Sequence, residues 1–454
     1  MKRILCLLLA LAMLVILSAC GLNKLRDIEL PPLPDLNAHE EKPAATDRPL
    51  VIETPLPNVL PTITPTEAPV QESLPAQEGR MPTSGQVLIN FLHTAYENFD
   101  PEEGTQRILT FAYDTPVLVM EDRPASAEEI NRQIALLDEA FYMGDENLEG
   151  SFGYNGMLEM AEDNYAYMRQ SGEAGAVTEY STSRTVSSAR VDDRMINLLF
   201  TYHDYTGGAH GNYAQEAYVF DSYNGERLQL EDLTSDYPAL RDCIIHYMIA
   251  LTETDSDLYE HIYLDWIPNN DFYAAFAKLL RQGSWYFDDR GLIVFSSLYE
   301  LGPYAAGTAR FGIPYGELKG KIEDKWLPEN RTESGSIQIM GKTDAENGRY
   351  AFVDRVELSA DGEEFCVTVD GTAYDVKLSS VSYVDRFYEK DELWFASKLQ
   401  NAAVQVIADV PEALPSLMLS YSDDAGKKHS YVISRNGKSG GVQLVADTAL
   451  QSFG

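Results

Sequence analysis

Two histidines and an aspartate lie close together in the segment HDYTGGAHGN, which runs from residue 203 to residue 212. His203, Asp204 and His210 have the chemistry of a zinc site or of a hydrolase that activates water. A zinc site needs three or four ligands that converge on one ion. Adjacent strand residues point to opposite faces of a sheet, so His203 and Asp204 need a bulge to share an ion. No third ligand follows at a fitting spacing, and we expect neither a metal nor another cofactor.

Motifs of the common enzyme classes give no better candidate. The sequence has no H-E-x-x-H motif and no Walker loop. Its 71 acidic residues would allow a carboxylate pair to form almost anywhere, so such a pair indicates nothing by itself. We therefore expect no catalysis. The alternative is a hydrolase of cell-wall polymers with His203, Asp204 and His210 at its site.

A structural interpretation accounts for more of the segment. INLLFTYHDY and YAQEAYVFD are typical of strands, and the chain between them must reverse its direction. Gly207, Gly208 and Gly211 permit positive φ or close approach of the backbone. His210 and Asn212 can bond the backbone of such a loop. The sequence thus predicts a shaped connection, and His210 is either structural or also part of a ligand surface.

Tyrosine is abundant, with 27 residues in the chain, and a surface that binds a ligand could use it. Tyr299, Tyr304 and Tyr315 follow each other closely about 100 residues after the glycine-rich segment. Packing between a sheet and helices is the alternative explanation for these side chains. The candidate ligand-binding residues are His203, Tyr205, His210, Asn212, Tyr299 and Tyr304.

The N-terminus has the pattern of a secretory signal. Lys2 and Arg3 precede an apolar run from residue 4 to residue 17, which is short for a membrane helix. The tetrapeptide LSAC that follows resembles a bacterial lipobox, which implies cleavage before Cys20 and acylation of that cysteine. An ordinary signal peptide that ends near Ala19 is the alternative. Several acyl chains on one residue anchor stably, so we expect lipid attachment to the extracytoplasmic face of the cell membrane.

Residues 20–80 are rich in proline, as in ETPLPNVLPTITPTEAP, and favour extended conformations over helices or ladders. We interpret them as a semi-rigid stalk behind the lipid-modified cysteine; a proline-rich ligand segment is the rival interpretation. The formal net charge of −36 argues against a nucleic-acid partner, because phosphate binding relies on Lys and Arg. It suits a cationic partner, although solubility explains it equally well.

The rest of the chain predicts an α+β fold. Between residues 81 and 330, an antiparallel sheet should pack with helices. The expected strands lie at 105–121, broken at Pro116, and within 179–205, 215–233 and 284–322. The expected helices lie at 126–143, 155–172, 237–251 and 269–283. Ser126 and Glu129 have the spacing of a capping box. Residues 84–99 have both helix-like and strand-like spacings.

From residue 331 to residue 454, short strand-like runs alternate with turn dipeptides such as Asp370-Gly371. This pattern predicts a small all-β domain, a sandwich or a barrel. Once the N-terminal cysteines are assigned, only Cys243 and Cys366 remain, too few for a disulfide framework or a cysteine-based zinc site. They could pair, but they lie in different predicted domains, and we expect two buried free thiols.

Two stretches together resemble a known extracellular module. FTYHDYTGGAHGNYAQEAYVFDSYNGERLQLEDL carries the pattern Tyr-Thr-Gly-Gly-Ala-His-Gly, and DDRGLIVFSSLYELGPYAAGTARFGIPYGEL follows about 70 residues later. They are similar to the extracellular domain of unknown function shared by the anti-sigma-V factor of Gram-positive bacteria and the non-catalytic region of peptidoglycan deacetylases. The resemblance covers about 240 residues and implies an α+β fold with a curved antiparallel sheet. In the anti-sigma factor this region binds lysozyme, a basic protein.

The sequence patterns and the resemblance together give the expected domain organisation. A lipoprotein signal peptide at 1–19 and the stalk at 20–80 precede a companion α+β domain at 81–185. The module itself spans 186–330 and the β-rich C-terminal domain spans 331–454. The family's module brings no catalytic residues to carry over. We expect a lipid-anchored binding or sensing protein of the bacterial envelope, with lysozyme or peptidoglycan as candidate partners; a wall hydrolase and a structural envelope lipoprotein are the alternatives.

Overall fold

The computed structural model describes residues 85–144, 152–171, 177–331, 333–348, 350–384, 387–410, 417–435 and 441–446. The predicted signal peptide, Cys20 and the stalk lie outside these residues. None of the helices in the described ranges is long and apolar enough to cross a membrane.

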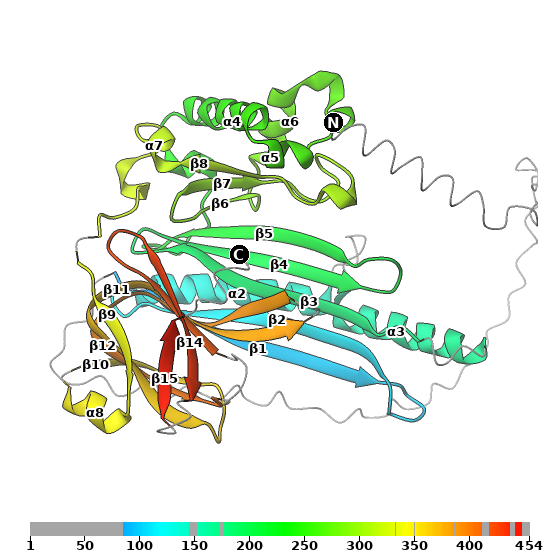
Figure 1. Cartoon of the computed structure of the whole chain (residues 1–454). Helices are drawn as coiled ribbons and strands as arrows, with labels where there is room; N and C mark the ends of the chain where they lie inside the picture. The colour runs from blue at the N-terminus through cyan, green and yellow to red at the C-terminus, as the bar shows by residue number, and fades with distance from the viewer. Residues whose placement is uncertain are drawn as a thin grey trace, which may run out of the picture. The chain divides into compact units, whose positions relative to one another are not determined.

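A large sheet runs through most of the described chain (Figure 1). Its main path has the strand order β15-β14-β13-β11-β12-β1-β2-β3-β4-β5. The strands of its first part are β1 (Leu88–Phe99), β2 (Arg107–Val119), β3 (Tyr180–Val191), β4 (Met195–Tyr205) and β5 (Asn212–Asp221). All neighbours in this part are antiparallel except β2 and β3, which run parallel. Residues 84–99, whose pattern was ambiguous, thus contribute a strand.

The prediction that Pro116 breaks the second strand segment is wrong, because β2 runs through it and pairs Pro116 with Phe91 of β1. β3 pairs with β2 only as far as Tyr113, so β2 has a ladder partner on one side at the proline. A strand tolerates proline where one side is unpaired. Nearby, the side chain of Asn131 bonds both the N–H and the carbonyl of Leu118, at 2.8 and 2.9 Å, in place of a strand.

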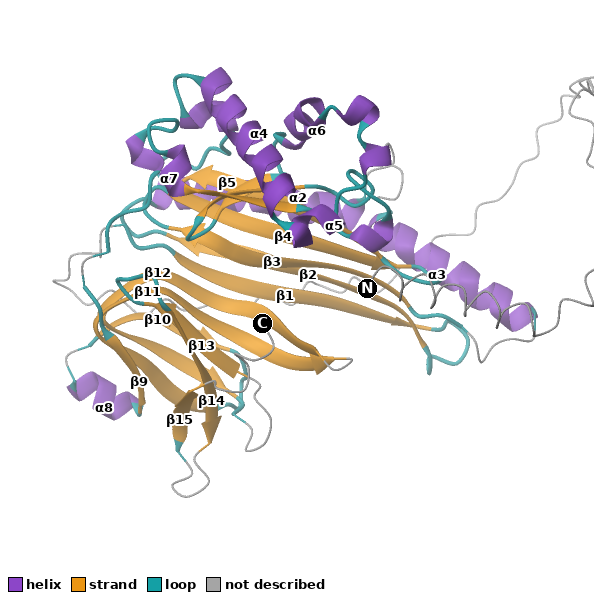
Figure 2. Cartoon of the chain, turned by 45° about the horizontal axis from the view of Figure 1, so that its top comes forward, coloured by secondary structure: helices purple, strands orange, loops and turns teal. Residues whose placement is uncertain are grey.

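Helices α2 (Pro124–Met143) and α3 (Gly153–Gln170) pack on the first part of the sheet (Figure 2). Ile130 and Ile134 are buried against sheet residues, as their spacing of four predicts. The capping box predicted at Ser126 is wrong, because α2 begins two residues earlier with Pro124 in its first turn. A proline suits that position because its missing N–H would be unsatisfied there in any case. The Ser126 hydroxyl instead donates to the Ser222 carbonyl at 2.8 Å.

A second, three-stranded sheet lies beside β5 and is covered by helices (Figures 1 and 2). Its strands are β6 (Trp285–Phe287), β7 (Gly291–Phe295) and β8 (Arg310–Pro314). The helices of this region are η3 (Leu230–Leu233), α4 (Tyr237–Thr254), α5 (Ser256–Glu260), η4 (Leu264–Trp266), η5 (Pro268–Asn270), α6 (Phe272–Leu279), η6 (Tyr304–Ala306), α7 (Tyr315–Leu318) and η7 (Asp324–Trp326). Backbone bonding joins the two sheets, since the Ala217 N–H donates to the Gly283 carbonyl at 2.7 Å.

The C-terminal strands continue the large sheet rather than closing a barrel within the described ranges. They are β9 (Ser336–Met340), β10 (Ala351–Glu357), β11 (Glu363–Val384), β12 (Phe387–Ala408), β13 (Leu417–Ser422), β14 (Lys428–Arg435) and β15 (Val442–Ala446), with the short helix α8 (Lys342–Asn347). Asp370-Gly371, predicted as a hairpin turn, lies inside β11, where the register shifts between Val369 and Thr372. Gly371 takes a φ of 78°, and its N–H donates to the Asn401 side chain at 2.9 Å. This pair forms a bulge in the long β11–β12 hairpin.

The α+β fold is confirmed: antiparallel strands pack with helices in the first part, and strands dominate the C-terminal part. The two parts are joined where Leu88, Ile89 and Asn90 of β1 pair with β12. The domain boundaries at 185 and 330 stay predictions. Cys243 and Cys366 are free thiols, as expected, but only Cys366 is buried, whereas Cys243 is partly exposed. Burial raises the pKa of Cys366 to about 11.

Candidate ligand-binding surface

The glycine-rich segment is the connection of the β4–β5 hairpin, as the structural interpretation predicts. Asp204 pairs with Asn212 at its base. Gly207 and Gly208 take φ angles of 92° and 98°, which side chains rarely adopt. A Cβ on Gly211 would lie 2.7 Å from the Asp204 carbonyl oxygen. Each glycine therefore has a steric reason to be there.

His210 contacts a residue that lies far away in sequence. Its ring stacks on the ring of Tyr304 in η6, with centroids 3.8 Å apart and an angle of 17° between the planes. The Tyr304 hydroxyl donates to the Gly211 carbonyl at 2.7 Å. The His210 Nδ1 lies 3.0 Å from the same carbonyl oxygen. The two stretches that carry the family resemblance thus meet at the tip of the β4–β5 hairpin.

The other candidate residues of the hairpin have partners in the same hairpin. The Tyr205 hydroxyl donates to the Gly208 carbonyl at 3.2 Å. His203 faces Tyr213 across the hairpin, with ring centroids 5.0 Å apart. Asn212 is exposed at the first position of β5. His203 and Tyr205 therefore contact residues of the hairpin itself, and Asn212 pairs with Asp204 at its base.

Tyr299 extends the aromatic contact away from the hairpin. Its ring centroid lies 5.9 Å from that of Tyr304 and 6.4 Å from that of Trp266, to which it is nearly parallel at 25°. Tyr299 is 53% exposed and Trp266 41% exposed, unlike most large aromatic side chains of this fold. The four rings of His210, Tyr304, Tyr299 and Trp266 form a row, which we call the aromatic row.

The backbone is strained at residues in or next to this row. Five residues other than glycine have positive φ in the described ranges, and three of them, Asn269, Asn270 and Tyr299, lie here. A tyrosine at a φ of 62° is costly and persists only where its surroundings enforce it. The Arg281 guanidinium supplies part of that enforcement: it donates to both carboxylate oxygens of Glu300, at 2.6 and 2.9 Å. Glu300 in turn accepts from the Ser297 N–H at 2.8 Å, which fixes the loop carrying Tyr299.

A depression of about 510 Å³ opens next to the row. Its lining residues are Tyr259, His261, Ile262, Tyr263, Ala305 and Ala306. Two backbone features shape it: the Tyr263 N–H donates to the Leu301 carbonyl at 2.8 Å, and Gly302 lies against the Tyr263 ring. A Cβ on Gly302 would be 2.8 Å from that ring, so glycine allows the close packing. His261 Nδ1 bonds the Ala306 carbonyl, which holds its imidazole in place.

Sequence reasoning missed this depression and one of the four rings of the row, Trp266. The sequence feature that could have indicated this surface is the segment YEHIYLDW from Tyr259 to Trp266, which places four aromatic or imidazole rings within eight residues. The segment falls between two predicted helices and has no periodic pattern, so it gave no reason to expect an exposed surface. Tyr315, in contrast, packs inside: its ring stacks on Phe287 with centroids 5.9 Å apart. The packing explanation thus holds for Tyr315, whereas Tyr299 is exposed.

The surface is acidic. Residues 253–271 include six Asp or Glu and no Lys or Arg. Glu253 and Asp265 are exposed among them. On the hairpin, burial raises the pKa of Asp204. The described residues include no group of three or more His, Cys, Asp or Glu side chains that could hold a metal ion.

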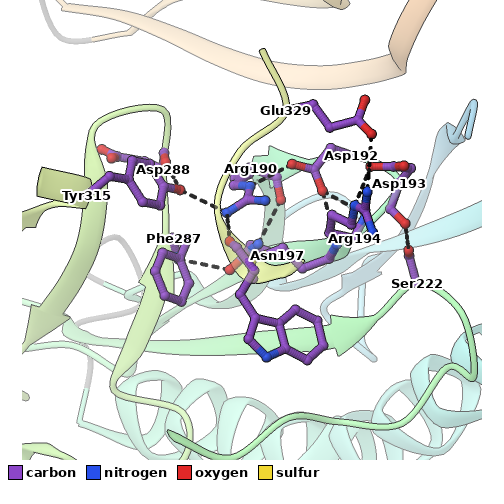
Figure 3. A network of polar contacts seen from close by, with 12 residues as sticks. Arg190, Asp192, Asp193, Arg194, Asn197, Ser222, Phe287, Asp288, Tyr315 and Glu329 are labelled. Atoms are coloured by element: carbon purple, nitrogen blue, oxygen red, sulfur yellow. Dashed lines mark hydrogen bonds and ion pairs between the residues drawn. The ribbon is translucent and has the colours of Figure 1, made fainter. Parts of the chain in front are cut away.

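A second polar cluster lies at the β3–β4 turn (Figure 3). The pKa of Asp193 is raised to about 6, mainly by burial and secondly by contact with the Glu329 carboxyl. Arg190 donates to Asp192 at 2.6 Å and to the Trp326 carbonyl at 2.7 Å, which connects the turn to the segment after β8. Shifted carboxyl groups often mark functional sites. Because these side chains bond one another and backbone groups, we interpret the cluster as a structural link.

Comparison with known proteins bears on the region of the depression. Residues 253–316 match a family described as "Protein of unknown function (DUF3298)". These residues form a DUF3298 domain. The match includes the depression and three rings of the row, Trp266, Tyr299 and Tyr304, but not His210. The predicted domain of unknown function is confirmed for these residues.

Solved structures of the same family are similar to this chain. A DUF3298 family member from Bacteroides fragilis is 18% identical, with a TM-score of 0.39 over 52% of this chain and 94% of that one. A DUF3298 family protein from Pseudomonas aeruginosa is 20% identical, with a TM-score of 0.29 over 53% of this chain and 97% of that one. No curated protein matches the chain.

Proposed function

We propose that this chain is a lipid-anchored, non-catalytic binding protein of the bacterial cell surface, and that the aromatic row on and beside its DUF3298 domain binds the ligand. The observation that carries the proposal is the exposure of Trp266 and Tyr299, which a strained and clamped backbone holds in place. Exposed apolar surfaces of this kind mark interaction sites in soluble domains. Tryptophan and tyrosine are also among the residues that contribute most to binding.

The lipid anchor rests on the N-terminal sequence. The positive start, the apolar run and Cys20 in the LSAC tetrapeptide have the pattern of a lipoprotein signal. The proline-rich residues up to 80 would hold the folded part away from the membrane. This placement makes envelope components and extracellular proteins the candidate partners.

Charge supports a basic protein as the ligand. Residues 253–271 combine six acidic residues with exposed aromatic rings and include no Lys or Arg. Lysine and arginine side chains interact favourably with aromatic faces, and complementary charge speeds association. The resemblance to the extracellular domain of the anti-sigma-V factor suggests lysozyme as the first protein to test.

The test is retention of lysozyme by the full chain, purified in detergent and immobilised. We expect retention at low salt that weakens as salt rises, because exposed charges are screened. An acidic protein of similar size should pass through. Replacing Glu253 and Asp265 by their amides should reduce retention, whereas Glu139→Gln, a change at an exposed position of α2, should not. Failure of wild-type chain to retain lysozyme at low salt would contradict the basic-protein ligand.

A wall glycan is the second candidate ligand, because flat exposed rings surround a depression of the size that small ligands occupy. The hydrolase hypothesis has weaker support. His203 pairs with Tyr213 and His210 stacks on Tyr304, so the two histidines take part in different contacts. Release of soluble wall fragments by the purified chain would favour the hydrolase.

A further inference from the structure

We propose that the depression lined by Tyr259, His261 and Tyr263 binds one hexopyranose ring of an uncharged or amino-sugar glycan, and that the aromatic row binds the next rings of the same chain. This inference rests on the proposed function, because it uses the same surface, and it goes beyond it by assigning a ligand class to the depression.

The walls of the depression fit a sugar ring. Tyr259 and Tyr263 are 47% and 44% exposed, so their rings are available to a ligand. Ile262, Ala305 and Ala306 supply a small aliphatic lining. The C–H groups on one face of a pyranose carry partial positive charge and suit the negative face of an aromatic ring. A depression of about 510 Å³ has room for one such ring with part of its neighbours.

One fixed polar group complements these walls. A carbonyl oxygen only accepts hydrogen bonds, so the bond to Ala306 requires that His261 Nδ1 carries a hydrogen. In the neutral imidazole, Nε2 is then an acceptor. Because His261 lines the depression, this acceptor suits a hydroxyl or an amide N–H of a sugar. Few, well-placed polar groups among apolar walls are typical of small-ligand sites.

The aromatic row makes a polymer a better ligand than a single sugar. Ala305 and Ala306 line the depression, and Tyr304 of the row directly precedes them. Tyr263 and Trp266 lie on the same short segment, where the Trp266 N–H donates to the Tyr263 carbonyl at 2.8 Å. Two short segments, 263–266 and 304–306, therefore each contribute residues to both the depression and the row. A chain of sugar rings can contact both at once, whereas a monosaccharide can fill only one.

The charge of the surface around the depression indicates which glycans can bind. The lining residues include no Lys or Arg, and the 253–271 segment is acidic. A phosphate- or carboxylate-bearing polymer would be repelled. Hydroxyl, acetamido and ammonium groups can all donate hydrogen bonds to carboxylates. Uncharged and amino-sugar glycans are thus favoured over anionic wall polymers.

The fluorescence of Trp266 allows glycan binding to be tested in the full chain, purified in detergent. Of the four tryptophans, Trp285, Trp326 and Trp394 are at most 3% exposed, so quenching by acrylamide reports mainly on Trp266. We expect the N-acetylglucosamine hexamer to protect Trp266 saturably, with an affinity that does not change with salt because the hexamer is uncharged. A hexamer of galacturonate, which has the same ring size but carries carboxylates, should bind more weakly at low salt.

Variants locate the site. Tyr263→Ala and Tyr259→Ala should each weaken hexamer binding about tenfold, as expected for loss of a central aromatic contact. Tyr263→Phe keeps the ring and should bind nearly as wild type. Tyr167→Ala, at a tyrosine on α3 that is 69% exposed, is the matched control and should not change the affinity. Melting curves identify any variant that fails to fold. If one of the two alanine variants does not fold, the binding measured for the other one tests the site.

Several outcomes would overturn the inference. These are the absence of saturable protection by the hexamer, unchanged affinity in folded Tyr259→Ala and Tyr263→Ala variants, and equal binding of the galacturonate hexamer. If lysozyme is retained but the hexamer is not bound, the sugar assignment fails and the proposed function stands. If neither is bound, both fail.

Discussion

Tyr304 of the DUF3298 domain lies flat against His210 of the β4–β5 hairpin, with ring centroids 3.8 Å apart, and bonds the carbonyl of the following Gly211 at 2.7 Å. Two residues separated by 94 positions in sequence therefore share one contact. This contact explains why a glycine-rich hairpin and a tyrosine-rich loop occur in the same chain. The hairpin tip supports the aromatic row from one end, so a change at either residue should affect both stability and the surface.

The first prediction concerns His210. His210→Ala removes the stack on Tyr304, which should lower the free energy of unfolding by about 0.5–1.5 kcal/mol. Tyr304→Phe keeps the stack but removes the bond to Gly211, at a cost of about 1 kcal/mol. Urea denaturation of the single and double variants measures both. A hydrolase would behave differently: His210→Ala would abolish release of wall fragments and leave stability unchanged.

The second prediction concerns Gly302. A Cβ here would lie 2.8 Å from the Tyr263 ring, 3.1 Å from the Ala306 Cβ and 3.2 Å from the His261 carbonyl oxygen. Gly302→Ala should therefore displace the Tyr263 ring, reduce stability by about 1–3 kcal/mol and weaken any ligand of the depression. Gly316→Ala is the control, because open space surrounds that position. If both variants bind the ligand equally well and have the same melting temperature, the position of the Tyr263 ring does not depend on Gly302.

Local sequence pattern predicted most elements of this fold, and two of its failures have identifiable physical causes. Pro116 was expected to break a strand, but β2 continues through it, because the pairing with β3 ends at Tyr113 and leaves one side of β2 unpaired at the proline. Ser126 was expected to cap a helix, but the preceding proline starts it earlier. The first failure depends on strand pairing between residues distant in sequence, and the second on a neighbouring proline.

The candidate surface was only half predictable, for a different reason. His210, Tyr299 and Tyr304 were chosen from motif composition, and the structure brings these three together. Tyr263 and Trp266 lie in a short irregular segment, where neither helical nor strand periodicity distinguishes exposed from buried rings. The position of the Tyr263 ring depends on its close packing against Gly302, which lies far away in sequence.

The third prediction concerns the buried Arg184. Its guanidinium lies within 5.1–5.4 Å of the ring centroids of Tyr113, Phe141 and Phe200, and it donates to Asp138. Asp138→Asn removes the counter-charge and should cost about 3–5 kcal/mol, because an unpaired charge then remains buried. The double variant with Arg184→Met and Asp138→Leu should recover much of this loss. Urea denaturation measures each variant, and a double variant less stable than Asp138→Asn would contradict the argument.

The last prediction is a pH dependence at Asp193. Burial and the neighbouring Glu329 carboxyl raise its pKa from the usual 3.8 to about 6 in the folded chain. The folded state therefore keeps a proton that the unfolded state has already released between these values. Linkage then requires that this contribution to stability is fully present below about pH 4 and is lost as the pH rises through about 6.

Asp193→Asn should remove the effect, because an amide does not titrate. The melting temperature of the wild-type chain should fall between pH 5 and pH 7.5 by more than that of the variant. Above pH 6 the variant should be at least as stable as wild type, since repulsion from Glu329 is gone. Glu139→Gln, at an exposed position of α2, should follow the wild-type profile. A wild-type chain whose stability difference from Asp193→Asn stays constant over this range would show that Asp193 does not carry the proton.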